Sequence, residues 1–79
     1  MNEITILKLK NRVLEILREC NDSTLTDICK NQVLSIIEPL NLTCLFDLQD
    51  KLKNATKLHE VRELILSIAQ VLNSAYKIC

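Results

Sequence analysis

Apolar residues recur along the chain at intervals of three and four positions, the period of an α-helix with one buried face. The two longest series lie near the ends of the sequence. The first consists of Ile6, Leu9, Val13, Ile16 and Cys20. The second consists of Leu58, Val61, Ile65, Ile68, Leu72, Ala75 and Cys79. This pattern predicts a long helix at each end of the chain.

Two shorter series lie between these long ones. The first comprises Leu25, Ile28, Val33, Ile36 and Ile37, and the second comprises Leu45, Leu48 and Leu52. The segments NDST, PLNL and NAT interrupt the apolar spacing, and residues of these types favour turns and helix caps. We therefore predict four helices, over about 3–20, 25–38, 43–53 and 57–78.

The expected helix ends rest on local side-chain chemistry. Thr24, with Asp27 three residues later, is typical of a capping box, and Thr43 and Thr56 are the expected caps of the last two helices. Pro39 disfavours helical backbone at Glu38 and should end the second helix there.

The connections are short, and glycine is absent. Short loops make consecutive helices antiparallel neighbours, while tight hairpins and phosphate-binding loops usually need glycine. The predicted fold is all-α, a compact up-down bundle of four helices in a single domain, 1–79.

The last helix has an unusually broad apolar face. Leu64, Val71 and Ile78 form a second row beside the main series, and Leu66 lies outside both rows. A face this wide suits a helix that contacts two neighbours, or one neighbour and another protein. Two alternatives stay open: the bundle covers the whole face, or the face forms a homodimer or binds a partner. Leu64, Leu66, Val71 and Ile78 are the candidate protein-binding residues.

Charge and hydropathy indicate no strong attraction to nucleic acid or membrane. Ten basic residues balance ten acidic ones. No apolar run is long enough to span a bilayer, and the first residues lack the pattern of a secretion signal. The expected location is therefore cytoplasmic, with no membrane partner.

Four cysteines raise the question of zinc or disulfides. No C-x-x-C spacing occurs, and the bundle would place Cys20 and Cys29 at one pole and Cys44 and Cys79 at the other. One tetrahedral zinc site cannot use ligands at both poles. Two disulfides, Cys20–Cys29 and Cys44–Cys79, are conceivable, but a reducing compartment favours buried thiols.

No set of residues predicts catalysis. His59 is the only histidine, is expected on a polar helix face, and has no glycine-rich turn nearby to expose a nucleophile. We expect a protein that is not an enzyme, has no cofactor or metal, and has no identifiable small-molecule substrate.

Nucleic-acid binding is the alternative function that we consider. Lys51, Lys53, Lys57 and Arg62 gather around the last connection and could contact phosphate groups. The apolar and acidic start of the third helix is unsuited to reading a DNA groove. The favoured hypothesis is a small helical interaction protein, a regulator, adaptor or stoichiometric inhibitor, that recognises itself as a homodimer or another protein through a helix face.

Overall fold

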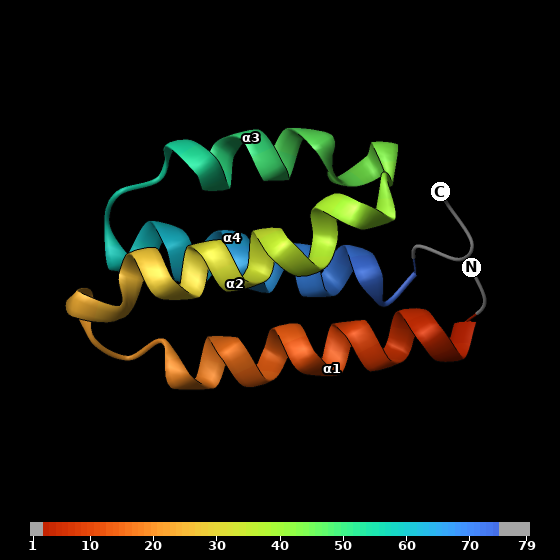
Figure 1. Ribbon diagram of the computed structural model, residues 1–79, viewed down its shortest axis with the longest axis horizontal. Helices are drawn as coiled ribbons and strands as arrows, with labels where there is room; N and C mark the ends of the chain where they lie inside the picture. Colours follow the sequence, from red (N-terminus) through yellow and green to blue (C-terminus); the bar gives the residue numbers. More distant parts are fainter. Residues whose placement is uncertain (1–2, 75–79) are drawn as a thin grey trace.

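Four α-helices run up and down alongside one another in the computed structural model, which describes residues 3–74 (Figure 1). They are α1 (Glu3–Glu19), α2 (Thr26–Ile37), α3 (Phe46–Asn54) and α4 (Leu58–Leu72). α1 packs against α2 and α4 on one side of the molecule, and α3 packs against the same two helices on the other. The predicted all-α class with four helices is confirmed, whereas the homodimer stays a prediction.

Short 3-10 helices join the main helices. They are η1 (Ser23–Leu25), η2 (Glu38–Leu40) and η3 (Thr43–Leu45). Asn73 and Ser74 form a turn after α4, and the predicted continuation of this helix to residue 78 lies outside the described residues. No helix within residues 3–74 is long and apolar enough to cross a membrane.

The helix caps differ from those expected. Asp22, not Thr24, caps the chain before α2, because its carboxylate accepts a hydrogen bond of 2.9 Å from the Thr24 backbone N–H. That hydrogen bond lowers the pKa of Asp22 below its ordinary value of 3.8. Thr43 and Thr56 also fail as predicted caps: Leu42 stands at the cap of η3 and Lys57 at the cap of α4, neither with a side-chain cap hydrogen bond.

Asn41 takes the place that glycine usually fills between α2 and α3. Its backbone is left-handed, with φ 52° and ψ 41°, and it is the only described residue with positive φ. Asparagine tolerates this region better than other residues with a Cβ. A chain without glycine can therefore still reverse sharply after Pro39.

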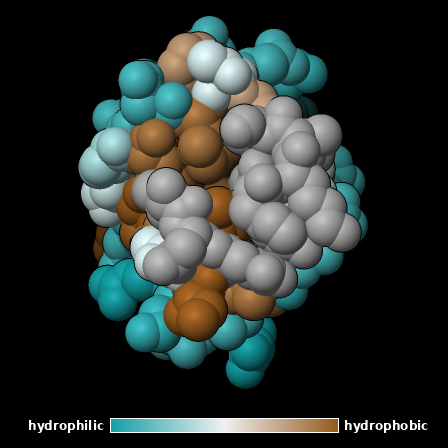
Figure 2. Space-filling view, turned by 90° about the vertical axis from the view of Figure 1, so that its right-hand side faces the viewer, coloured by the Kyte–Doolittle hydropathy of each residue, from teal (hydrophilic) through white to brown (hydrophobic). Residues whose placement is uncertain are grey.

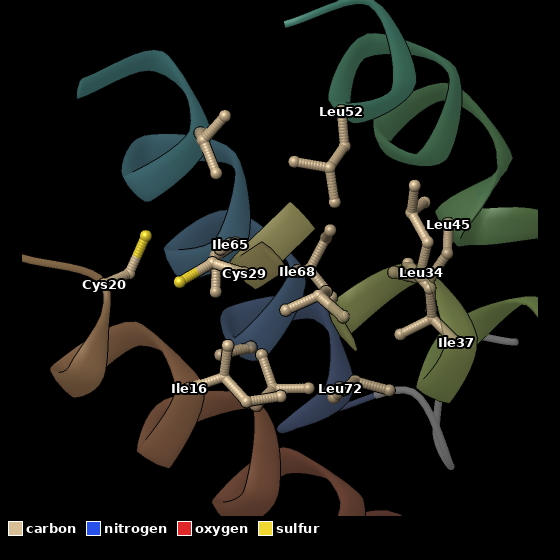
Figure 3. Close-up of a cluster of buried hydrophobic side chains, with 14 of the residues drawn as sticks. Ile16, Cys20, Cys29, Leu34, Ile37, Leu45, Leu52, Ile65, Ile68 and Leu72 are labelled. Carbon is tan, nitrogen blue, oxygen red and sulfur yellow. The ribbon is translucent and has the colours of Figure 1, made fainter. Parts of the chain in front are cut away.

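One hydrophobic core receives side chains from all four helices (Figure 3). Its fully covered members include Val13, Val33, Leu52, Ile65 and Ile68, which confirms the inward positions predicted for these five residues. α4 is rich in apolar residues because it contacts each of the other three helices.

The predicted face of α2 is partly wrong. Ile28 is 53% exposed, whereas Cys29 and Leu34, which lie outside the expected series, are buried. Cys29, Val33 and Ile37 follow one another at intervals of four, and this row points into the core. The dense apolar sequence of α2 allows several rotations about the helix axis, and packing against α1, α3 and α4 selects one of them.

Two basic side chains cap the carboxyl ends of helices that are not their own. From α4, the Arg62 guanidinium donates to the backbone oxygens of Leu17, at 3.0 Å, and Cys20, at the end of α1. From α2, the Lys30 ammonium donates to the oxygens of Ala55, at 2.9 Å, and Lys53, at 3.3 Å, at the end of α3. Helix carboxyl ends carry unpaired carbonyls and partial negative charge. Each helical hairpin therefore supplies a cationic cap to the other.

Candidate interaction surface

The candidate protein-binding residues of α4 differ in exposure. Leu66 is 45% exposed, while Leu64 and Val71 are half-buried and pack against the core. Ile78 lies outside the described residues. The bundle therefore leaves part of the broad apolar face of α4 uncovered.

Leu64 and Leu66 do not lie on one surface. Leu64 and Leu66 are two positions apart, which places them about 200° apart around the helix axis. Leu64 faces a groove between α3 and α4, whereas Leu66 faces a smaller pocket between α1 and α4. The structure thus places Leu64 beside α3 and places Leu66, which the sequence already set outside the two apolar rows, beside α1.

The groove on the α3 flank has a volume of about 560 Å³. Ala55, in the α3–α4 connection, and Leu64 supply its apolar lining. Asp50 borders it from α3, and Glu60 and Glu63 border it from α4. Lys51, Asn54 and Ser67 complete the lining, so the groove combines a small apolar patch, in which Leu64 is half-buried and Ala55 is 5% exposed, with an acidic margin.

The three carboxylates at this margin have no basic partner. None of them forms an ion pair with another residue in the described range. Lys51 also borders the groove, but its ammonium lies 3.2 Å from the Asp47 carboxylate, one turn earlier in α3. The groove therefore carries a local negative charge in a chain whose net charge is zero.

The pocket on the α1 flank is smaller, about 280 Å³. Half-buried Leu14 and exposed Leu66 line it from opposite helices. At its edge the Lys10 ammonium donates a hydrogen bond of 3.0 Å to the Asn73 side-chain oxygen. The seam thus combines Leu14, Leu66 and Ala69 with a Lys10 ammonium that is bound to Asn73, the residue after α4.

Exposed apolar side chains are otherwise dispersed. Besides Leu66, the large exposed ones in the described part of the chain are Ile4, Ile28 and Phe46, one on each of the other helices. Figure 2 shows the end of the molecule where α1 begins and α4 ends, with apolar side chains in the middle of the view and hydrophilic ones around its edge. No single apolar face dominates.

The basic residues of the nucleic-acid alternative are mostly engaged by other groups. The Lys51 ammonium pairs with Asp47, the Lys53 ammonium lies 3.5 Å from a Glu38 carboxylate oxygen, and Arg62 caps α1. Lys57 is exposed in the α3–α4 connection. These residues do not form a continuous positive stripe of the kind that follows a phosphate backbone.

The reactive side chains are separated. His59 is exposed in the first turn of α4, whereas Cys20 and Cys29 are buried at the end of α1 and near the start of α2. Among residues 3–74 no group of three or more His, Cys, Asp or Glu side chains has an arrangement suited to a metal ion.

The predicted buried thiols are confirmed for two cysteines. Cys20 and Cys29 are both free and lie side by side, as Figure 3 shows. Cys44 is instead disulfide-bonded, so the thiol prediction is wrong there; Cys79, its partner in the disulfide alternative, lies outside the described residues. A disulfide is unusual in a reducing compartment, and the expected cytoplasmic location stays a prediction.

We expect Cys29 to resist alkylation in the folded protein. Burial and a hydrogen bond with Cys20 raise its pKa from 9.0 to about 12, which leaves about a thousandfold less thiolate at pH 8. Iodoacetamide labelling, followed by mass spectrometry of the Cys29 peptide, should be at least about a hundredfold slower in buffer than in urea. Equal rates would contradict the burial of Cys29.

The raised pKa of Cys29 also makes the free energy of unfolding depend on pH. The folded state favours the neutral thiol, so the stability that this preference contributes is fully present below pH 9.0 and should be lost as the pH rises from 9.0 towards 12.

Sequence reasoning missed the acidic groove. In the sequence, each carboxylate taken by itself looks like an ordinary solvated position on a helix; the three are Asp50, Glu60 and Glu63. They border one groove only because α3 and α4 pack against each other. Comparison of the chain with protein-family models, with curated proteins and with solved structures finds no match.

Proposed function

We propose that this chain is a small, non-enzymatic helical interaction protein, a regulator, adaptor or stoichiometric inhibitor that recognises proteins through the flanks of α4. The observation that carries the proposal is the exposure of Leu66 on the helix at the centre of the core. Leu66 shares one pocket with half-buried Leu14 of α1, and this pair offers a small apolar contact of the kind that helix-face recognition uses.

The proposed first partner is a second copy of the chain. Leu14 and Leu66 line the α1–α4 seam, and a two-fold axis through that seam would place the two residues against the same pair in the other copy. The Lys10–Asn73 hydrogen bond already holds the adjacent basic side chain, so the apolar centre is not obstructed by a free ammonium group.

We expect Leu66→Glu to weaken self-association while leaving the fold intact. Leu66 is 45% exposed in a single copy, so the substitution should change the free energy of unfolding little. At a dimer seam it would bury an unpaired carboxylate, and loss of an anchor side chain costs about 2 kcal/mol or more, roughly a thirtyfold weaker dimer. Light scattering at two protein concentrations measures the change.

Ile28→Glu is the matched control. Ile28 is 53% exposed on α2, and it lines neither the α1–α4 seam nor the groove. The Ile28→Glu substitution should therefore leave the oligomeric state of the protein unchanged. A wild-type chain that stays monomeric at high concentration, or equal effects of the two substitutions, would contradict the homodimer.

A further inference from the structure

The groove between α3 and α4 has features that the self-association seam lacks. Its lining combines Ala55 and Leu64 with the carboxylates of Asp50, Glu60 and Glu63. The seam near Leu66, by contrast, has Lys10 and no acidic residue in its lining. Two flanks of one helix therefore differ in charge, and each fits a different kind of surface.

The size of the groove limits its occupant. α3 has 9 residues, which gives it a length of about 14 Å at 1.5 Å per residue. A helix lying along this groove would contact it over two to three turns, enough for one or two apolar side chains to reach Leu64. A contact of this size is small, so specificity would depend strongly on charge.

The charges at the margin define what such a helix must carry. The carboxylates of Asp50, Glu60 and Glu63 have no internal basic partner among the described residues. The single neighbouring ammonium, that of Lys51, is directed to Asp47. Lysine or arginine side chains beside an apolar anchor would complement this margin.

We propose that the α3–α4 groove binds a basic amphipathic helix of a partner protein, with an apolar side chain against Leu64 and Ala55 and with lysine or arginine side chains beside Asp50, Glu60 and Glu63. This inference rests on the proposed function, helix-face recognition, but it uses the flank of α4 opposite to Leu66. It assigns a partner chemistry to a surface that self-association does not occupy.

The probe is a synthetic amphipathic helix of about 18 residues composed of leucine and lysine, with a twin in which glutamate replaces lysine. Titration calorimetry should show binding of the lysine peptide and no binding of the glutamate peptide. Because the contacts are charged and exposed, affinity should fall about tenfold or more when the salt concentration rises from about 50 to about 500 mM.

The double variant Glu60→Gln and Glu63→Gln should lower the affinity of the protein for the lysine peptide at least about tenfold. The matched control, Glu15→Gln and Glu19→Gln, removes the same charge from exposed positions of α1 and should change affinity by less than about twofold. In the wild-type protein, amide chemical shifts should change around Ala55 and Leu64, which locates the contact without any substitution.

Equal losses in the two double variants, shift changes outside the α3–α4 groove, or no binding of the lysine peptide would each overturn the inference. A second copy of the chain as the occupant would show as self-association that Glu60→Gln and Glu63→Gln weaken, and this too would overturn it. If the peptide does not bind while Leu66→Glu still disrupts a dimer, the groove assignment fails and the proposed function stands.

Discussion

Replacing Ile65 by alanine is expected to lower the free energy of unfolding by about 3 kcal/mol, within the range for large apolar core residues. Ile65 is fully buried on α4, among core side chains of the other helices (Figure 3). The substitution removes three carbon atoms and leaves a cavity that close-packed neighbours refill only in part. A domain of this size has a total stability of roughly 4–12 kcal/mol, so the loss should be conspicuous in urea denaturation followed by circular dichroism.

Leu66→Ala is the matched control, because Leu66 is the next residue on the same helix and is 45% exposed. It should change the unfolding free energy of a single copy by no more than about 0.5–1 kcal/mol. The comparison is made at a concentration where the protein is monomeric, since self-association would add to apparent stability. Similar losses at the two positions would contradict the buried position of Ile65 and the exposed position of Leu66 on α4.

Replacing Arg62 by methionine is expected to cost about 2 kcal/mol, from the loss of charge-assisted hydrogen bonds. The guanidinium spans from α4 to the carbonyl oxygens of Leu17 and Cys20 at the end of α1. Methionine retains most of the aliphatic stem but leaves both oxygens without this donor. Thermal and urea denaturation of the variant measure the effect.

Two further variants separate hydrogen bonding from charge. Arg62→Lys keeps the positive charge near the end of α1 but loses the planar fork, so it should recover only part of the stability. Arg12→Met removes an exposed arginine from α1 and should have little effect on the unfolding free energy. If Arg62→Met and Arg12→Met unfold at the same urea concentration, the capping role is wrong.

The capping by Arg62 also bears on the nucleic-acid alternative. An arginine held between two helices contributes to stability, and its donors are directed at backbone oxygens instead of at solvent. Lys30 has the corresponding position at the end of α3, with its side chain mostly covered. Basic residues that a sequence scan counts as a surface patch can thus join helices inside the fold.

The two proposed surfaces are compatible with each other. Self-association would use Leu14 and Leu66 on the α1 flank of α4, and the partner helix would use Leu64 on the α3 flank. Since the flanks point in different directions, a dimer could present two acidic grooves. Substitutions on one flank should therefore leave binding on the other unchanged.

The sequence by itself determined the all-α class, the number of helices and most of the buried series. Val13, Ile16, Ile65 and Ile68 are buried as predicted, because strict spacing on a long helix leaves one choice of inward face. The ends of α1 and α2 lie within one residue of those expected. The reason given for Pro39 was wrong, however, because Glu38 keeps helical φ and ψ (−58° and −45°) and the chain continues through Pro39 as a 3-10 helix. These features are local, and local chemistry is enough to specify them.

Only the tertiary structure decided which groups from different helices meet. It turned Ile28 outward and Cys29 inward, placed Leu64 beside α3 and Leu66 beside α1, and assigned Arg62 to the end of α1. The rotation of an apolar-rich helix about its axis, and the reach of a long side chain to another helix, depend on residues distant in the chain. Periodicity within one helix carries no information about these partners, and packing of the whole bundle supplies it.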